Sequence, residues 1–279
     1  MSTPFRPLPL TTPIEPGFGR PAANGGGVRQ AVHGHAIGRF DVAVASACGS
    51  LHASNEDAHS PVDGDGRLFV VADGVGGGAM AQMASRQLVA LLHDALAGQR
   101  IDPDRVRQAV LDADRAIARR IALLTDAPGA ATLVLCAPQN VFASKWLLAW
   151  VGDCRVYRLG AAPGARLELL TRDDTFGELG EVPPPGGSPG DPARMVGNGA
   201  VSAASVVLHE LASGDLLALC SDGVHKQLGS DDWHRVLRQD VALAQRCEDL
   251  VALARARGGS DDATVLLVHR AGLRRGASA

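Results

Sequence analysis

The chain has 279 residues, of which 46% are hydrophobic and 20% are charged, and its formal net charge at pH 7 is −3. This length and hydrophobic content suit a globular protein with a sizeable core, while the weak charge and 4% aromatic content argue against a nucleic-acid partner. No apolar run reaches the length of a membrane-spanning helix, and the first residues carry no apolar segment of the secretory type.

The cysteines are scattered along the chain, are odd in number and form no C-x-x-C pair. They are Cys48, Cys136, Cys154, Cys220 and Cys247. This pattern is typical of reduced, mostly buried thiols in a cytosolic protein and not of disulfides or a zinc site. We therefore expect a cytoplasmic protein without a membrane segment, and we expect it to be a monomer.

The first part of the chain predicts a tail, two strands and two helices. Residues 1–38 are rich in Pro and Gly, which predicts a flexible tail before one domain over 39–271 and a short basic tail over 272–279. Apolar patterns predict strands at 40–47 and 68–73. Helical spacing of apolar residues predicts a helix over 79–97, and Asp102-Pro103 marks the start of a second helix.

The second part is richer in strands. Strands are predicted at 131–137, 145–152, 154–160, 166–171, 204–211, 215–222 and 263–270, and a helix at 241–257. Gly152-Asp153 predicts a tight hairpin between two of these strands, and Trp146 and Trp150 are expected to pack against a helix. The irregular, proline-rich stretch 173–200 is typical of a functional or mobile loop. Runs of strands interrupted by helices indicate an α+β layered fold.

A glycine-rich loop follows the predicted strand at 68–73. Residues 74–79 fit the pattern G-x-G-x-x-A between a strand and a helix, which is the local setting of a dinucleotide site. Asp73 stands at the entrance of this loop, where its carboxylate would repel a pyrophosphate. Two helices are predicted where a dinucleotide site requires a parallel strand. We therefore interpret the loop as something other than a nucleotide site.

Acidic residues recur at strand ends or in turns beside strands. They are Asp73 in VVADG, Asp153 in VGDCR, Asp222 in CSDG, Asp261 in GGSDDAT, and Glu56 and Asp57 in SNEDAH. Each alone is also typical of an ordinary turn. If strand ends bring them together, their carboxylates need a cation, and oxygen ligands favour magnesium or manganese. Two such ions about 3.5–4 Å apart would activate a water for attack on phosphorus.

Six segments resemble, in order and approximate spacing, the motifs of the metal-dependent protein phosphatases, the type-2C (PPM) serine/threonine phosphatases. They are SNEDAH (54–59), VVADGVGG (70–77), WVGDCRVYRL (150–159), LTRDD (170–174), GDLLALCSDGV (214–224) and GGSDDATVLLV (258–268). The resemblance covers about residues 40–270 and is nearest to the compact bacterial members. It implies an α+β fold, a four-layer α/β/β/α sandwich with two central antiparallel sheets flanked by helix pairs.

The resemblance also implies the function and the site residues. The function is metal-dependent hydrolysis of phosphoserine and phosphothreonine in proteins, reversing a bacterial Ser/Thr kinase, with the kinase or its targets as substrates and two Mn²⁺ or Mg²⁺ ions as cofactors. A role in type VI secretion is one setting among others. Residues 173–200 would form a flap beside the cleft. The implied metal residues are Asp73 as the bridge between both ions, the carbonyl of Gly74, Asp222 and Asp261 as direct ligands, Glu56 and Asp57 through water, and Asp153 for a third, weaker ion.

The chain departs from the family pattern at several positions. His52 stands where many members place an arginine that grips the substrate phosphate, and it lacks the bidentate fork of arginine. It is therefore either a tentative phosphate ligand or an ordinary loop residue. Val75, Asp262 and Cys154 also replace family residues, and none of these changes removes a direct metal ligand.

Two further expectations concern His225 and the function as a whole. His225 is expected to be an exposed loop residue. The alternative function is a catalytically weak, phosphatase-like module that binds phosphoproteins or regulates them.

Overall fold

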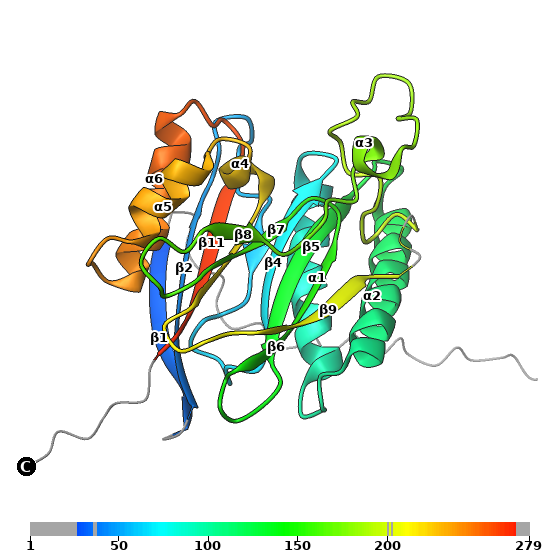
Figure 1. Ribbon diagram of the computed structural model, residues 1–279. Coiled ribbons are helices and arrows are strands. Elements are labelled where there is room, and N and C mark those ends of the chain that lie inside the picture. The colour runs from blue at the N-terminus through cyan, green and yellow to red at the C-terminus, as the bar shows by residue number, and fades with distance from the viewer. Residues whose placement is uncertain (1–26, 36–37, 200, 202, 272–279) are drawn as a thin grey trace, which may run out of the picture.

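The strands form two antiparallel sheets that pack face to face, with helices on the outer face of each (Figure 1). The computed structural model describes residues 27–35, 38–199, 201 and 203–271. Within this part of the chain, the order of the first sheet is β1 (Gly27–His35), β2 (Gly38–Ala47), β11 (Ala263–Arg270), β10 (Leu216–Cys220), β7 (Arg155–Leu159) and β8 (Leu167–Leu169). The order of the second sheet is β3 (Ala58–His59), β4 (Phe69–Val75), β5 (Ala130–Pro138), β6 (Lys145–Val151) and β9 (Ser205–Glu210).

Two helix pairs complete the four layers, as the fold class predicted from the sequence requires. Against the second sheet pack α1 (Ala79–Leu96) and α2 (Pro103–Leu124), and against the first sheet pack α5 (Ser230–Leu237) and α6 (Leu243–Ala256). The short helices are α3 (Phe176–Leu179) and α4 (Asp222–His225). The predicted start of α2 is confirmed, because the side chain of Asp102 accepts a hydrogen bond from the backbone N–H of Arg105. Within the described ranges, none of these helices is long and apolar enough to cross a membrane.

A dry aromatic and aliphatic core fills the space between the two sheets. The strand β6 alternates its side chains, so that Trp146 and Trp150 face the first sheet while Leu147 faces the helices on the other side. The Trp146 ring lies edge-on to Phe40 of β2, with centroids 5.1 Å apart. The expectation that Trp146 and Trp150 pack against a helix is therefore wrong; the period of two assigned them to one face, but only the fold decides what covers that face.

The first strand lies inside the stretch 1–38 that was predicted to be a tail. Over 27–35 the chain pairs with β2 in a register that runs from Gly27 opposite Ser46 to His35 opposite Gly38. His33 stacks on Phe40, with ring centroids 5.5 Å apart. The apolar pattern of this segment is too weak to predict a strand, and its order comes from the neighbour that it pairs with. Residues 1–26 and 272–279 lie outside the described residues.

The hairpin predicted at Gly152-Asp153 is wrong, because the chain crosses there from the second sheet to the first. The strand before it, β6, pairs with β5 and β9, and the strand after it, β7, pairs with β10 and β8. Gly152 has φ 92°, and a Cβ on it would lie 2.4 Å from the side chain of Thr132. The same turn residues suit a hairpin and a crossing, so the strand partners decide between them.

Candidate metal centre

One end of the sandwich gathers the acidic residues that the sequence singled out. Asp73 lies in β4 opposite Thr132 of β5, Asp153 lies at the crossing after β6, and Asp222 opens α4 directly after β10. Asp261 stands just before β11, and the pair Glu56-Asp57 just before β3. The charges of Asp57, Asp222 and Asp153 act on Asp73, and the charge of Asp222 acts on Asp261. Glu56 and Asp261 both lie within 4 Å of Nδ1 of His52, so segments far apart in the sequence meet here. The expectation that strand ends bring these carboxyls together is thus confirmed.

Asp73 sits at the centre of this cluster. Burial and the surrounding charges of Asp57, Asp222 and Asp153 raise its pKa well above the ordinary value of an aspartate, and its carboxyl also shares a hydrogen bond with Asp222. Clustered carboxyls without a cation respond in this way, because their charged forms repel one another. The arrangement therefore favours a cation among these oxygens.

Asp57 and Glu56 each present a buried carboxyl oxygen without a hydrogen-bond partner among the described residues. Asp57 accepts a hydrogen bond on Oδ2 from the hydroxyl of Ser221, at 2.7 Å, while its Oδ1 is unpaired. Glu56 accepts one on Oε1 from the backbone N–H of Gly78, while its Oε2 is unpaired. Burial raises the pKa of Asp57 to about 8. Unpaired buried oxygens of this kind are costly unless a cation or an ordered water satisfies them.

Lys226 places an ammonium group beside two of the predicted metal residues. Its Nζ lies 2.6 Å from Oδ2 of Asp222 and 3.2 Å from Oδ2 of Asp153. Burial alone would raise the pKa of Asp222, but Lys226 outweighs it and the pKa is lowered. Burial and the charge of Asp222 raise the pKa of Asp153 to about 6, against the opposing effect of Lys226. The cluster thus has one region that already holds a positive charge.

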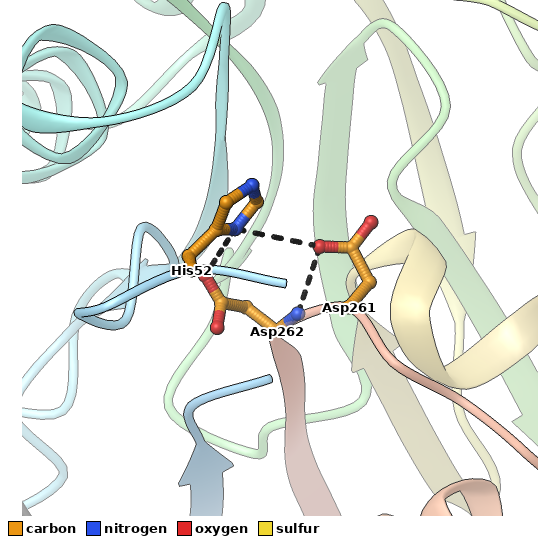
Figure 2. A group of neighbouring side chains, drawn as sticks. All are labelled: His52, Asp261 and Asp262. Atoms are coloured by element: carbon orange, nitrogen blue, oxygen red, sulfur yellow. Dashed lines mark hydrogen bonds and ion pairs between the residues drawn. The ribbon is translucent and has the colours of Figure 1, made fainter. Parts of the chain in front are cut away.

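His52 lies beside three carboxylates at the edge of the cluster, and two of them, Asp261 and Asp262, are drawn in Figure 2. Its Nδ1 lies 3.5 Å from Oδ2 of Asp262, 3.8 Å from Oε1 of Glu56 and 3.9 Å from Oδ1 of Asp261. The other ring nitrogen points away from Asp261 and Asp262 in Figure 2. His52 is therefore part of the cluster and not a remote loop residue.

Asp262, which stands beside His52, clamps the backbone. Its Oδ1 accepts from the N–H of Gly49 at 2.6 Å and its Oδ2 from the N–H of Glu56 at 2.7 Å. The side chain is buried, so these two bonds satisfy a charge that water cannot reach. Asp262 thereby fixes the loop that carries Glu56 next to the one that carries Asp261.

The glycine loop after Asp73 brings backbone close to the cluster. A Cβ on Gly74 would lie 2.6 Å from the carbonyl oxygen of Ala81 and 2.8 Å from that of Glu56, so only glycine fits there. Gly76, Gly77 and Gly78 all have positive φ, as a sharp turn requires. The strand β4 pairs antiparallel with β3 and β5, unlike the parallel sheet of a dinucleotide site. This antiparallel topology agrees with the interpretation of the loop as something other than a nucleotide site.

His225 and Cys154 are both buried beside the cluster. His225 is 6% exposed and its Nε2 lies 2.9 Å from the carbonyl oxygen of Asp153, so the expectation of an exposed loop residue is wrong. It follows an S-D-G turn that packs inward as α4, which the turn residues alone do not reveal. Cys154 is a free thiol. Burial and the nearby charge of Asp73 raise its pKa, so the thiol is harder to ionise. Cys154 is thus one of the buried thiols that the sequence pattern predicts.

The loop between β8 and β9 starts beside this cluster. The backbone N–H of Gly152 donates to Oδ2 of Asp174 at 3.1 Å, and Arg155 donates to both oxygens of Asp173, from Nε to Oδ1 and from a terminal nitrogen to Oδ2. The far end of the loop is held by Asp114 of α2, whose Oδ1 accepts from the N–H groups of Gly197 and Gly199. In Figure 1 the part that carries α3 rises at the same end of the molecule as α4.

Some contacts of the site could have been predicted and others could not. Lys226 stands four residues after Asp222, a spacing at which helical side chains meet. The link from Lys226 to Asp153, and those from Ser221 to Asp57 and from Asp114 to the loop, join segments that no local pattern relates.

Known proteins resemble the chain in sequence and in structure. The serine/threonine protein phosphatase PstP of Mycobacterium tuberculosis is 30% identical over 232 residues, which cover 78% of this chain and 43% of PstP. The chain thus spans less than half the length of this relative. No protein-family model matches the chain.

Two solved structures share the fold. The catalytic domain of PstP, solved in complex with two manganese ions, superposes with a TM-score of 0.71 and 25% identity, covering 84% of this chain and 99% of that one. PppA, described as a key regulatory component of T6SS in Pseudomonas aeruginosa, gives a TM-score of 0.71 and 26% identity, covering 87% of this chain and all of that one.

Proposed function

Since the chain belongs to the family of bacterial, PPM-type serine/threonine protein phosphatases, we propose that it hydrolyses phosphoserine and phosphothreonine in proteins with the help of two Mn²⁺ or Mg²⁺ ions. The observation that carries this proposal is the cluster of carboxyls from both sheets, in which Asp73 is crowded by Asp57, Asp222 and Asp153. The two manganese ions in the related catalytic domain of PstP support the choice of metal.

The residues of the cluster fit a pair of hard divalent cations. All candidate donors are oxygens, and buried oxygens of Glu56 and Asp57 have no partner among the described residues. Asp73 would bridge both ions, with the carbonyl of Gly74 on one of them and with Asp222 and Asp261 on the other. Glu56 and Asp57 would act through water. When bound, the two ions supply an activated water and stabilise the charge that develops on the phosphate oxygens.

Several residues of the chain would prepare this site without binding metal. Ser221 orients the carboxyl of Asp57, and Asp262 holds the loop of Glu56 through two backbone N–H groups. We propose His52 as a ligand of the substrate phosphate, because its ring borders the cluster and its outer nitrogen is directed away from Asp261 and Asp262. The loop 173–199 would border the substrate, since its first residues contact Gly152 beside Asp153.

The cellular setting is also part of the proposal. We propose that the substrates are a bacterial Ser/Thr kinase or its targets, and that the protein acts as a monomer in the cytoplasm. Five cysteines, all free and four of them buried, suit a reducing compartment. The likeness to PppA makes proteins of type VI secretion one substrate class to test.

The test is phosphatase turnover with a matched pair of substitutions. We expect p-nitrophenyl phosphate and a phosphothreonine peptide to be hydrolysed with Mn²⁺ and not with EDTA. Asp222→Asn should lower turnover by at least about 100-fold, since even outer-shell partners of metal ligands are worth 10–100-fold. Asp63→Asn makes the same chemical change on an exposed turn before β4 and should leave turnover unchanged.

A chain that shows no metal-dependent turnover above Asp222→Asn would contradict the enzymatic proposal. Binding of phosphopeptide without turnover would then favour the alternative, a phosphoprotein-binding or regulatory module. The pairing of Lys226 with Asp222 and Asp153 is the observation that favours this alternative, because it already removes part of the negative charge that attracts metal.

A further inference from the structure

Lys226 is an unusual residue for this chain. Of the 27 lysine and arginine residues only two are lysines, Lys145 and Lys226. Lys145 is exposed at the start of β6, whereas the ammonium of Lys226 lies among the carboxyls of the candidate metal centre. Lysine presents a compact point charge, in contrast to the planar fork of arginine. A compact ammonium group fits between the carboxylates of the candidate metal centre.

The contacts of Lys226 bridge the two regions of the cluster that the crossing brings together. The Nζ of Lys226 forms ion pairs with Oδ2 of Asp222, at 2.6 Å, and with Oδ2 of Asp153, at 3.2 Å. Asp153 is buried, and its backbone carbonyl is held by His225. The aliphatic stem of Lys226 is half-exposed, so the side chain reaches into the cluster from its rim. The ammonium of Lys226 thus forms an ion pair with Asp153, whose Oδ2 accepts no hydrogen bond among the described residues.

A metal ion on Asp153 would have to compete with this ammonium. A divalent ion there needs several oxygen ligands at about 2.0–2.6 Å. The ammonium of Lys226 already lies 2.6 Å from Oδ2 of Asp222 and 3.2 Å from Oδ2 of Asp153, the two carboxylates that would flank such an ion. Two cations at such close range repel strongly in a partly buried site. The expectation that Asp153 helps to hold a third, weaker ion therefore does not fit the residues present.

We propose that the ammonium of Lys226 takes the place of a third metal ion at Asp153, so that the centre of this chain holds two metal ions only. Asp153 is then a positioning residue that anchors Lys226. This inference rests on the proposed function, since it concerns the metal count of the same centre.

Metal counting tests the proposal directly. Chain stripped with EDTA and dialysed against excess Mn²⁺ should bind about two ions, and Lys226→Met should bind about three. Asp153→Asn in the Lys226→Met background should return the count to about two. Lys145→Met is the matched control and should bind as the unsubstituted chain does. A count of three for the unsubstituted chain, or an unchanged count for Lys226→Met, would overturn the proposal.

Lysine acetylation of the unsubstituted chain gives a second test of the proposal. This test can be carried out even if Lys226→Met fails to fold. Peptide mass spectrometry after brief treatment with acetic anhydride should show Lys145 modified and Lys226 protected, both with EDTA and with Mn²⁺. Protection that disappears when Mn²⁺ binds would mean that the ammonium yields its place to metal, and the proposal would be wrong. Failure of the proposed function differs visibly: the chain would then bind no Mn²⁺ and hydrolyse no phosphate ester.

Discussion

At the scale of single residues, the buried carboxyl of Asp57 links stability to pH. Burial is the main reason that its pKa is raised to about 8, against the hydrogen bonds that it accepts. An unfolded aspartate has a pKa of about 3.9, so between pH 4 and 8 the folded, metal-free chain keeps a proton that the unfolded chain has lost. The stability of the metal-free fold therefore falls as pH rises through this window.

We expect this fall to depend on Asp57 and to disappear with metal. The free energy of unfolding would be measured with urea in the presence of EDTA. Between about pH 7 and about pH 8 it should fall by about 1 kcal/mol more in the unsubstituted chain than in Asp57→Asn. Buried His225, with a pKa lowered to about 4, has the opposite effect on the pH dependence of stability. That effect falls at a lower pH than the range from pH 7 to pH 8 used here. Saturating Mg²⁺ should abolish the difference, and a difference that persists with Mg²⁺ would contradict the assignment.

Gly223 is the residue whose replacement should most directly separate the two acidic loops. A Cβ on it would lie 2.0 Å from the carbonyl oxygen of Asp262, so Gly223→Ala must push α4 away from the Asp261 loop. We expect a loss of about 1–3 kcal/mol in urea unfolding and weaker Mn²⁺ binding in a titration. Gly64→Ala is the control, since its nearest neighbour is 3.7 Å away. Equal stability of the two variants would refute the steric argument.

The acidic residues of the site could be predicted because each stands at a strand end in a recognisable motif. Their partners could not. Lys226 and His225 follow an S-D-G turn whose inward packing depends on α6 and on the crossing at Asp153. Buried polar partners of this kind depend on the tertiary fold, which a local sequence pattern does not predict.

At the scale of elements, Asp114 connects α2 to the loop that leads away from the cluster. Its Oδ1 accepts from the N–H groups of Gly197, at 2.7 Å, and Gly199, at 3.1 Å. Asp114→Ala leaves both groups unpaired, at a cost of about 1–3 kcal/mol each when buried. We expect faster hydrogen exchange over 193–199 and a lower melting temperature.

Asp114→Asn is the matched control for this prediction, because the amide keeps an oxygen in the same place. It should preserve most of the protection of the loop. If Asp114→Ala exchanged no faster than Asp114→Asn, the two hydrogen bonds would not be what holds the end of the loop.

The long, periodic elements were predicted within a few residues, and the errors have physical causes. The helix α2 combines an N-cap, a proline and a regular apolar stripe, so its residues alone specify it. The strand β1 carries few apolar residues and exists because β2 offers it a partner. The crossing at Gly152 resembled a hairpin because strand pairing is a long-range property.

At the scale of the whole molecule, the metals would join the two sheets. Asp73 belongs to the second sheet, whereas Asp222 and Asp261 adjoin β10 and β11 of the first. A ligand that binds only the folded state stabilises it by about 2.7 kcal/mol at 100 times its dissociation constant. For a domain of this size we expect Mn²⁺ to raise the melting temperature by about 5–10 °C.

The same melting experiment on Asp222→Asn should give a markedly smaller rise, because one proposed metal ligand is lost. Asp63→Asn, which lies on an exposed turn, should respond as the unsubstituted chain does. If Asp222→Asn and Asp63→Asn gained the same stability from Mn²⁺, the metals would bind elsewhere.

The pairing of β2 with β11 also fixes when the acidic cluster can assemble during synthesis. Residues 38–47 of β2 lie next to 263–270 in the first sheet, so β2 gains its second neighbour, β11, only after more than two hundred further residues have been synthesised. The Glu56-Asp57 loop and the Asp261-Asp262 loop meet at the end of this same pair. A nascent chain therefore cannot bring these two acidic loops together until β11 has emerged.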